Sequence, residues 1–412
     1  MKGTRICILI LALFAVWTLP VGCGGGGGSN GSSGSSGSVC GSLAAQTIAA
    51  TTTNVQPITV NGGPEGIVNS AYTSVTVCAP GTATCQTIAN VLVDTGSFGL
   101  RLLSSALPAA LYTTATAGNL GECVIFADGS YVWGPLQEFD VYIAGEKASS
   151  VPVHVLDPTF YAIKMPSACL SGGGPNDDTL AELGANGILG IGPIQYDCGN
   201  DCVNDTLYPV GQVYPYYNCS SLGGCVKTDV PLSQQVQNPV ALFSTDNNGV
   251  IVELPAVSGP TASVNGSLVF GIGTQSNNGL GSATVFTLNP NYLYSFNTIF
   301  NGISYPYSFI DSGSNGYFFT DSTISKDSNG WYIPSSTLSL SATNKGYNGN
   351  SSNVCFSVSN ADSMFGTYPH DFVFNNLAGY TVGYFDWGLP FFYGRNVYTS
   401  ITPDGNGSYW AY

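Results

Sequence analysis

The chain has 412 residues and a formal net charge of -15, with only 8% charged residues and 53 glycines. This length is enough for two domains of ordinary size, each with its own hydrophobic core. The acidic balance and the lack of any basic patch argue against nucleic acid as a partner. The composition, rich in glycine and small polar residues, predicts an exported all-β protein with few short helices.

The beginning of the chain resembles the signal of a bacterial lipoprotein. Two basic residues precede an apolar run over 6–19, which is too short to span a membrane as a helix. We expect residues 1–22 to be removed and Cys23 to carry a lipid; cleavage near the same place without lipidation is the alternative. The Gly/Ser-rich stretch 23–39 is a flexible tether by composition. This predicts a protein held at the bacterial outer membrane through its lipid alone, on the periplasmic or the cell-surface face.

Ten cysteines remain once Cys7 and Cys23 are set aside, and an even number in an exported chain predicts disulfide bonds. Sequence does not determine their connectivity. Short spacings favour three pairs, and the other four cysteines are paired by elimination. The expected pairs are Cys78–Cys85, Cys198–Cys202, Cys219–Cys225, Cys123–Cys169 and Cys40–Cys355. A zinc site at the closely spaced cysteines is the alternative, but with only two histidines and an oxidising compartment we expect no metal and no cofactor.

Strand patterns cover most of the chain, and a boundary between two lobes is expected within 230–240. This divides the chain after the tether into an N-terminal lobe, 40–230, and a C-terminal lobe, 231–412. The predicted elements are hairpins over 71–94 and 123–154, helices at 178–183 and 231–243, and strands within 249–308 and at 371–374 and 389–401. The segment 186–192 is an apolar run whose glycines permit close packing of the backbone.

An acid–hydroxyl–glycine–hydroxyl sequence follows the apolar, β-branched run Val91-Leu92-Val93. Alone, Asp94-Thr95-Gly96-Ser97 would be an ordinary turn with a solvated carboxylate. A second copy, Asp311-Ser312-Gly313-Ser314, follows the apolar Phe309-Ile310 in the other half of the chain. Two matching turns predict a paired-carboxylate site made from two halves.

Two carboxylates at close range cannot both ionise easily, so Asp94 and Asp311 are expected to share one proton. The ionised member can take a proton from water while the protonated member donates one to a carbonyl oxygen, which is general acid–base hydrolysis of an amide. The neighbouring residues are expected to support the pair: Ser97 and Ser314 by bonding the outer carboxylate oxygens, Thr95 and Ser312 by joining the two turns, and Gly96 and Gly313 by admitting the backbone.

The chain resembles the pepsin-like, two-lobed aspartic peptidases over roughly residues 66–405. Besides the two turns, the matching segments are 186–192, 266–273 and, more weakly, Trp387-Gly388 with 389–401. The resemblance implies a bilobal all-β acid protease fold in which Asp94 and Asp311 are catalytic. A monomer acting on a peptide or protein substrate is expected. The start of the chain and its Val-Asp-Thr-Gly-Ser run also resemble a bacterial lipoprotein family of unknown function.

The hairpin at 126–133 falls where the peptidases have a flap that closes over substrate, so Phe126, Asp128, Gly129 and Tyr131 are expected to contact substrate. Phe126 stands where the peptidases have a tyrosine and lacks its hydroxyl. Tyr131 is an alternative source of that group.

Arg101 replaces a tryptophan that supports the flap tyrosine in the peptidases. It is expected to pair with Asp128, to bind an acidic group of the substrate, or to lie on the surface beside a strand end. These departures leave open a non-catalytic pepsin-fold protein that binds a peptide, protein or glycan in its interlobe cleft. A cell-surface adhesin with two unrelated turns is a third interpretation. His154, in a strand pattern, is expected to be structural.

Overall fold

The computed structural model describes residues 52–162, 165–204, 215–290 and 295–412. Strands dominate these residues, and the α-helices among them are two short ones, α1 (Leu180–Leu183) and α2 (Ala361–Thr367). This confirms the prediction of a β-rich protein with few short helices. Within the described ranges, no helix is long and apolar enough to cross a membrane.

The described strands form two sheets. The 15 strands of the larger sheet are β1 (Val55–Asn61), β2 (Ser70–Cys78), β3 (Cys85–Asp94), β4 (Phe98–Leu103), β5 (Leu120–Ile125), β6 (Tyr131–Ile143), β7 (Glu146–Leu156), β8 (Gly187–Ile191), β9 (Tyr216–Ser220), β10 (Gly224–Lys227), β11 (Gly249–Leu254), β12 (Val264–Phe270), β13 (Val285–Thr287), β21 (Arg395–Ser400) and β22 (Tyr409–Ala411). The 7 strands of the smaller sheet are β14 (Phe296–Phe300), β15 (Ile303–Ile310), β16 (Tyr317–Phe319), β17 (Leu338–Lys345), β18 (Ser351–Val358), β19 (Ala378–Tyr380) and β20 (Asp386–Trp387). Single turns of 3-10 helix occur at η1 (Ser104–Ala106), η2 (Thr114–Thr116), η4 (Ser167–Leu170), η5 (Gly199–Cys202), η6 (Leu232–Gln234), η7 (Pro239–Leu242) and η9 (Leu389–Phe392).

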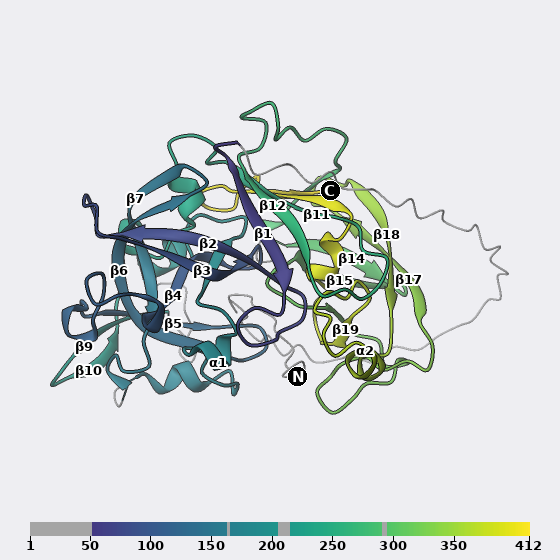
Figure 1. Ribbon diagram of the computed structural model, residues 1–412, viewed down its shortest axis with the longest axis horizontal. Helices are drawn as coiled ribbons and strands as arrows, with labels where there is room; N and C mark the ends of the chain where they lie inside the picture. Colours follow the sequence, from purple (N-terminus) through teal and green to yellow (C-terminus); the bar gives the residue numbers. More distant parts are fainter. Residues whose placement is uncertain (1–51, 163–164, 205–214, 291–294) are drawn as a thin grey trace.

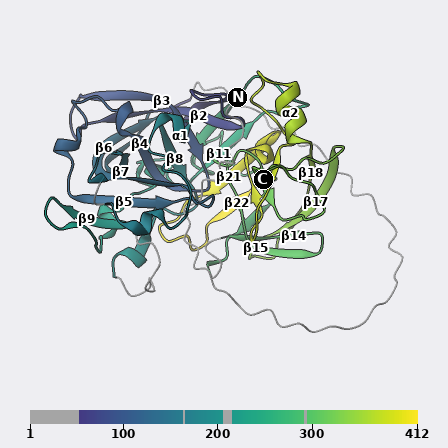
Figure 2. The same ribbon diagram turned by 90° about the horizontal axis from the view of Figure 1, so that it is seen from below.

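The first half of the chain, β1 to β10, and the second half, β11 to β22, occupy opposite sides of the molecule (Figure 1). The larger sheet joins them, because β1 pairs antiparallel with β12, with Val55 opposite Val269. From below, β11, β21 and β22 lie between the strands of the first half and the pair β14–β15 (Figure 2). The two halves are therefore connected by a shared sheet as well as by the chain.

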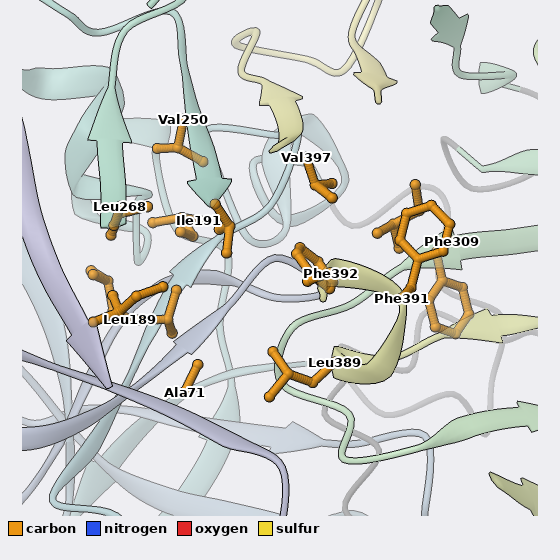
Figure 3. Packing of buried hydrophobic residues seen from close by; sticks show 14 of the residues in the cluster. Ala71, Leu189, Ile191, Val250, Leu268, Phe309, Leu389, Phe391, Phe392 and Val397 are labelled. Atoms are coloured by element: carbon orange, nitrogen blue, oxygen red, sulfur yellow. The ribbon is translucent and has the colours of Figure 1, made fainter. Parts of the chain in front are cut away.

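One large apolar cluster contains residues of both halves. Leu189 and Ile191 of β8 belong to it, as do Leu389 and Phe391 of η9. Figure 3 shows these side chains together with Val397 of β21 and others of the same cluster. Complete burial of such a side chain contributes roughly 1.5–3 kcal/mol, so this shared cluster stabilises the contact between the two halves.

Most predicted elements agree with the structure. The hairpin β2–β3, the hairpin β5–β6 and the short helix α1 all lie where they were expected. Helix α1 begins after Thr179, whose side chain accepts a hydrogen bond from Glu182 N–H, and ends at Gly184 in the left-handed conformation.

Three predicted elements are wrong or incomplete. The helix expected at 231–243 is the two separate turns η6 and η7, because Pro239 begins η7 and has no N–H to continue an earlier helix. The strand expected at 371–374 is reduced to one bridge between Thr261 and Val373. The segment 389–401 begins as η9 before it becomes β21.

Four of the predicted disulfide bonds are confirmed: Cys78–Cys85, Cys123–Cys169, Cys198–Cys202 and Cys219–Cys225. The zinc alternative is wrong, because the cysteines it needs are bonded to one another. Four disulfides indicate an extracellular or periplasmic environment. The signal, Cys23, the tether and Cys40 lie outside the described residues, so the pair Cys40–Cys355 stays a prediction.

Candidate active site

The two acid-containing turns meet where the first and second halves adjoin. Asp94 is the last residue of β3, and Asp311 directly follows β15. A Cβ atom added to Gly96 would lie 2.6 Å from Asp311 Cγ, and one added to Gly313 would lie 2.7 Å from Asp94 Oδ1. Each carboxyl group therefore packs on the glycine of the opposite turn, a position that admits no larger side chain.

Each carboxyl group receives two hydrogen bonds from its own turn. A backbone N–H donates to Oδ1 and a serine hydroxyl donates to Oδ2, as expected from the repeated sequence. The donors are Gly96 N (2.8 Å) and Ser97 Oγ for Asp94, and Gly313 N (2.7 Å) and Ser314 Oγ (2.7 Å) for Asp311.

The hydroxyls of Thr95 and Ser312 join the turns reciprocally. Thr95 Oγ1 donates to Ile310 O at 2.9 Å and accepts from Ser312 N–H at 3.0 Å. Ser312 Oγ donates to Val93 O at 2.7 Å and accepts from Thr95 N–H at 3.1 Å. All four hydrogen bonds are buried. Water therefore cannot compete for these groups, and the bonds hold the two turns at a fixed separation.

The strands around the two turns have the same topology. In the first half, β8 lies between β3, which is parallel to it, and β4, which is antiparallel. In the second half, β20 lies between the parallel β15 and the antiparallel β16. The outer strands of both groups also correspond, since β4 pairs in parallel with β7 and β16 with β19. The two acids thus occupy equivalent places in equivalent frameworks.

Both carboxyl groups are fully buried, and burial raises the pKa of each above the ordinary value. Hydrogen bonds from Asp311 and from its own turn, and the charge of Arg101, oppose this rise in the pKa of Asp94. The negative charges of Asp94 and Asp386 instead add to the effect of burial on the pKa of Asp311. The neighbours of the two carboxyl groups therefore act in opposite directions, lowering the pKa of Asp94 and raising that of Asp311.

The charged neighbours of the pair occupy equivalent rows of the two frameworks. Each row consists of one residue from each of three adjacent strands, paired side by side. It begins opposite the residue that lies two positions before the acid on the strand carrying the acid. From the strand beside the acid outward, the row reads Ile188, Arg101 and His154 in the first half, and Asp386, Phe318 and Gly379 in the second. The first row thus contains a cation where the second has a phenyl ring, and the second contains an acid where the first has an isoleucine.

Arg101 does not pair with Asp128 and does not lie on the surface, so both of those predictions are wrong. Its side chain is fully buried, with Nη2 at 3.1 Å from Glu122 Oε1 and 3.4 Å from Asp197 Oδ2. Its full burial also argues against direct contact with an acidic substrate group. The sequence did not reveal these partners, because one acid comes from β5 and the other from a loop distant in sequence.

The Arg101 cluster contains two further buried groups, His154 and Tyr216. His154 Nδ1 lies 3.0 Å from Glu122 Oε2, and Tyr216 donates to Asp197 Oδ1 at 2.6 Å. Burial, then the charge of Glu122, raise the pKa of Asp197 well above the ordinary range. Burial and the charge of Arg101 lower the pKa of His154 well below its ordinary value. Arg101 is therefore a buried cation shared by two buried acids, Glu122 and Asp197.

The predicted flap is a closed hairpin in the described structure. Phe126 accepts from Gly129 N–H at 2.9 Å, and Gly174 N–H donates to Gly129 O at 2.9 Å. Phe126 and Tyr131 are buried, whereas Asp128 at the tip is exposed. Ala127 packs against apolar clusters that contain second-half residues, so the tip reaches across the boundary between the halves.

Tyr384 connects this tip electrostatically to the carboxyl pair. Burial raises the pKa of Tyr384, and the charges of Asp386, Asp128 and Asp311 raise it further. Tyr384 therefore lies within electrostatic range of both the hairpin tip and the acids.

Residues 50–412 match the family described as Protein of unknown function (DUF3443). The chain belongs to the DUF3443 family. No curated protein matches it. The matched range contains both turns, the Arg101 cluster and Asp386, so the whole candidate site lies within the DUF3443 region.

Sequence reasoning missed several polar residues of the site in this DUF3443 chain: Glu122, Asp197, Tyr216 and Asp386. A signal existed for the last of these. Asp386 interrupts an apolar run two residues before Gly388, as Ile188 stands two residues before Gly190. Aligning the two halves on these glycines would have placed an acid beside β15.

Proposed function

We propose that the chain has the bilobal pepsin-like fold and is an aspartic endopeptidase, which hydrolyses peptide bonds between Asp94 and Asp311. The observation that carries the proposal is the reciprocal packing of each carboxyl group on the glycine of the opposite turn. That arrangement supports a pair with one shared proton.

The ionised carboxyl group takes a proton from a water molecule, whose oxygen forms a bond to the carbonyl carbon of the substrate. The protonated carboxyl group donates its proton to the carbonyl oxygen, so a neutral tetrahedral diol results. Breaking the C–N bond then requires a proton on the leaving nitrogen, supplied by the carboxyl group that first took one from water. At the same time the other carboxylate takes a proton back from a hydroxyl of the diol, which becomes the new carboxylic acid product. The pair returns to its starting state with one proton.

Substrate access requires a change from the closed arrangement. The side chains of Asp94 and Asp311 are 0% exposed. The hairpin 126–130 is the element best placed to move, because its tip contacts the second half and is held by the hydrogen bond from Gly174 to Gly129. Opening this hairpin belongs to the proposed catalytic cycle.

We also propose that the lipid on Cys23 attaches the protein to the outer membrane. The support is the lipoprotein-type start of the chain, followed by the Gly/Ser tether. The tether would let the β-rich domain work at a distance from the lipid surface.

The test compares the wild-type chain with Asp94→Asn and Asp311→Asn. Each is incubated with a mixed peptide library from about pH 3 to 7, with and without pepstatin, and products are mapped by mass spectrometry. We expect cleavage by the wild type alone, and inhibition by pepstatin. Equal product patterns from all three folded proteins would refute hydrolysis by this pair.

A second candidate is binding of a peptide, protein or glycan in the same region without cleavage. The specific observation in its favour is that Phe126 is buried in the cluster around Ile188 and offers no hydroxyl group toward a substrate. Saturable binding of a library component that is recovered intact would favour this candidate.

A further inference from the structure

Equivalent rows of the two frameworks carry opposite charges beside the carboxyl pair. Arg101 lies opposite Ile188 in the antiparallel pairing of β4 with β8, and Phe318 lies opposite Asp386 in the pairing of β16 with β20. Directly opposed residues of an antiparallel pair share a face of the sheet. The charged residues of the two halves therefore differ at equivalent positions: on the same face of the sheet, and equally far along the strands from Asp94 and from Asp311.

The contacts of Asp386 differ from those of the other acids at the site. It is fully buried on β20, and neither of its carboxyl oxygens receives a hydrogen bond from the described residues. Ser314 lies within its reach, but the single proton of the Ser314 hydroxyl is donated to Asp311 Oδ2 at 2.7 Å. With no donor among the described residues, ionisation of Asp386 is disfavoured, and once Asp386 is ionised nothing local offsets the effect of its charge on neighbouring carboxyl groups.

Ser314 therefore stands between two carboxyl groups of the second half. A negative charge on Asp386 disfavours a negative charge on Asp311, because both groups are buried and close to the same hydroxyl. The first half has no such group at the equivalent place, since Ile188 is apolar. It has the buried cation Arg101 instead, which favours negative charge on Asp94.

We propose that this difference assigns the roles within the pair: Arg101 favours Asp94 as the ionised base, and Asp386, through Ser314, favours Asp311 as the protonated acid. Asp386 and Arg101 are positioning residues, because neither touches the reacting atoms. The roles of base and acid rest on the peptidase function proposed above. Which of the two carboxyl groups holds the shared proton does not depend on that function.

The titratable and charged groups that act on Asp386 come from three elements. Asp311 follows β15, Asp94 ends β3, and Tyr384 precedes β20 itself. The neighbours of Asp386 on β15 and β16 are Phe309 and Phe318, which carry no charge. The charges that influence Asp386 are thus those of the pair.

The experiment is a carboxyl titration of the full chain with 13C-labelled aspartate, followed by NMR. Asp94→Asn and Asp311→Asn assign the signals of the pair in the wild type and in Asp386→Asn. We expect the pKa of Asp311 to fall by about 1 or more in Asp386→Asn, with a smaller change for Asp94. Asp386→Ile, which copies the first half, should have the same effect. Asp362→Asn, which removes an exposed carboxylate on α2, should leave the pair unchanged.

An unchanged pKa of Asp311 in both folded Asp386 variants would overturn the proposal. So would an Asp94 that ionises after Asp311 in the wild type. Arg101→Gln should raise the pKa of Asp94, and Arg101→Lys, which keeps the charge, should restore it.

Peptide cleavage provides a separate readout. If the wild type cleaves, the upper pH limit of its activity should fall in Asp386→Asn by the amount that NMR gives for Asp311. An NMR shift in a chain that cleaves nothing would support the assignment of protonation and refute the peptidase. Cleavage with an unmoved NMR titration would support the peptidase and refute the role of Asp386.

Discussion

The turn of the first half and the turn of the second half have the same backbone and different surroundings. Both carboxyl groups accept one backbone and one serine hydrogen bond, and both rest on a glycine. Behind them, the first half places Arg101 in a buried ion cluster, and the second places Asp386, which has no hydrogen-bond donor among the described residues. The comparison shows that the same turn can be built into surroundings of opposite charge, so the position of an acid and its electrostatic environment depend on different residues.

The largest loss of stability should come from Arg101→Met, which removes the cation of the buried ion cluster in the first half. Glu122 and Asp197 would remain buried without their cation, so we expect the free energy of unfolding to fall by about 3–5 kcal/mol. Urea denaturation measures this. Phe318→Leu, at the equivalent place in the second half, keeps an apolar side chain and should cost only about 1 kcal/mol. Equal losses in the two variants would contradict the comparison.

Gly96→Ala and Gly313→Ala test whether the two turns are equivalent in packing. The added Cβ would lie 2.6 Å from Asp311 Cγ in the first case and 2.7 Å from Asp94 Oδ1 in the second. We expect each to destabilise the fold by about 1–3 kcal/mol and to separate the carboxyl groups. Denaturation gives the first quantity, and pepstatin affinity gives the second. Gly118→Ala, at a site with open space around it, serves as the control.

Thr95→Val and Ser312→Ala test the reciprocal bonds between the turns. Each variant removes a buried hydroxyl that donates to one strand and accepts from the other turn, at a cost of about 1–2 kcal/mol. Because both hydroxyls serve one network, the double variant should lose less than the sum of the single losses. If urea denaturation shows that the loss in the double variant equals the sum of the two single losses, the hydroxyls of Thr95 and Ser312 act independently.

The smallest effect concerns the pH dependence of stability. The folded pKa values of Asp94, Asp311 and Asp386 lie above the unfolded value of 3.8, so the folded state binds more protons than the unfolded state above that pH. Their contribution to stability is complete below about pH 4 and is lost as pH rises through the folded values.

Asp386→Asn should reduce this loss, and at neutral pH it should stabilise the chain by on the order of 1 kcal/mol. Thermal melts from pH 4 to 8 measure the difference. Asp362→Asn removes the same charge from the surface and should leave the slope unchanged. A variant whose stability falls as steeply as that of the wild type would exclude Asp386 as a source of the pH dependence.

Local sequence was sufficient to predict the elements that carry the pair. The apolar lead to Asp94, its copy before Asp311 and the Cys78–Cys85 hairpin were all read from short patterns. The partners of Arg101 were not predictable in this way, because Glu122 is 21 residues away on β5 and Asp197 is 96 residues away in a loop, and only the tertiary fold brings them together. The helix expected at 231–243 failed for a local reason, the proline at 239.

The pairing of β1 with β12 also has a consequence for how the chain folds. Val55 cannot form its hydrogen bonds to the strand of Val269 until the intervening first half has been made and closed into a loop. Such a distant contact slows folding, since the entropy of loop closure is lost before any pairing is gained. Until then β1 presents an unpaired edge to other chains. We therefore expect truncation before residue 264 to yield a product that aggregates rather than a folded first half.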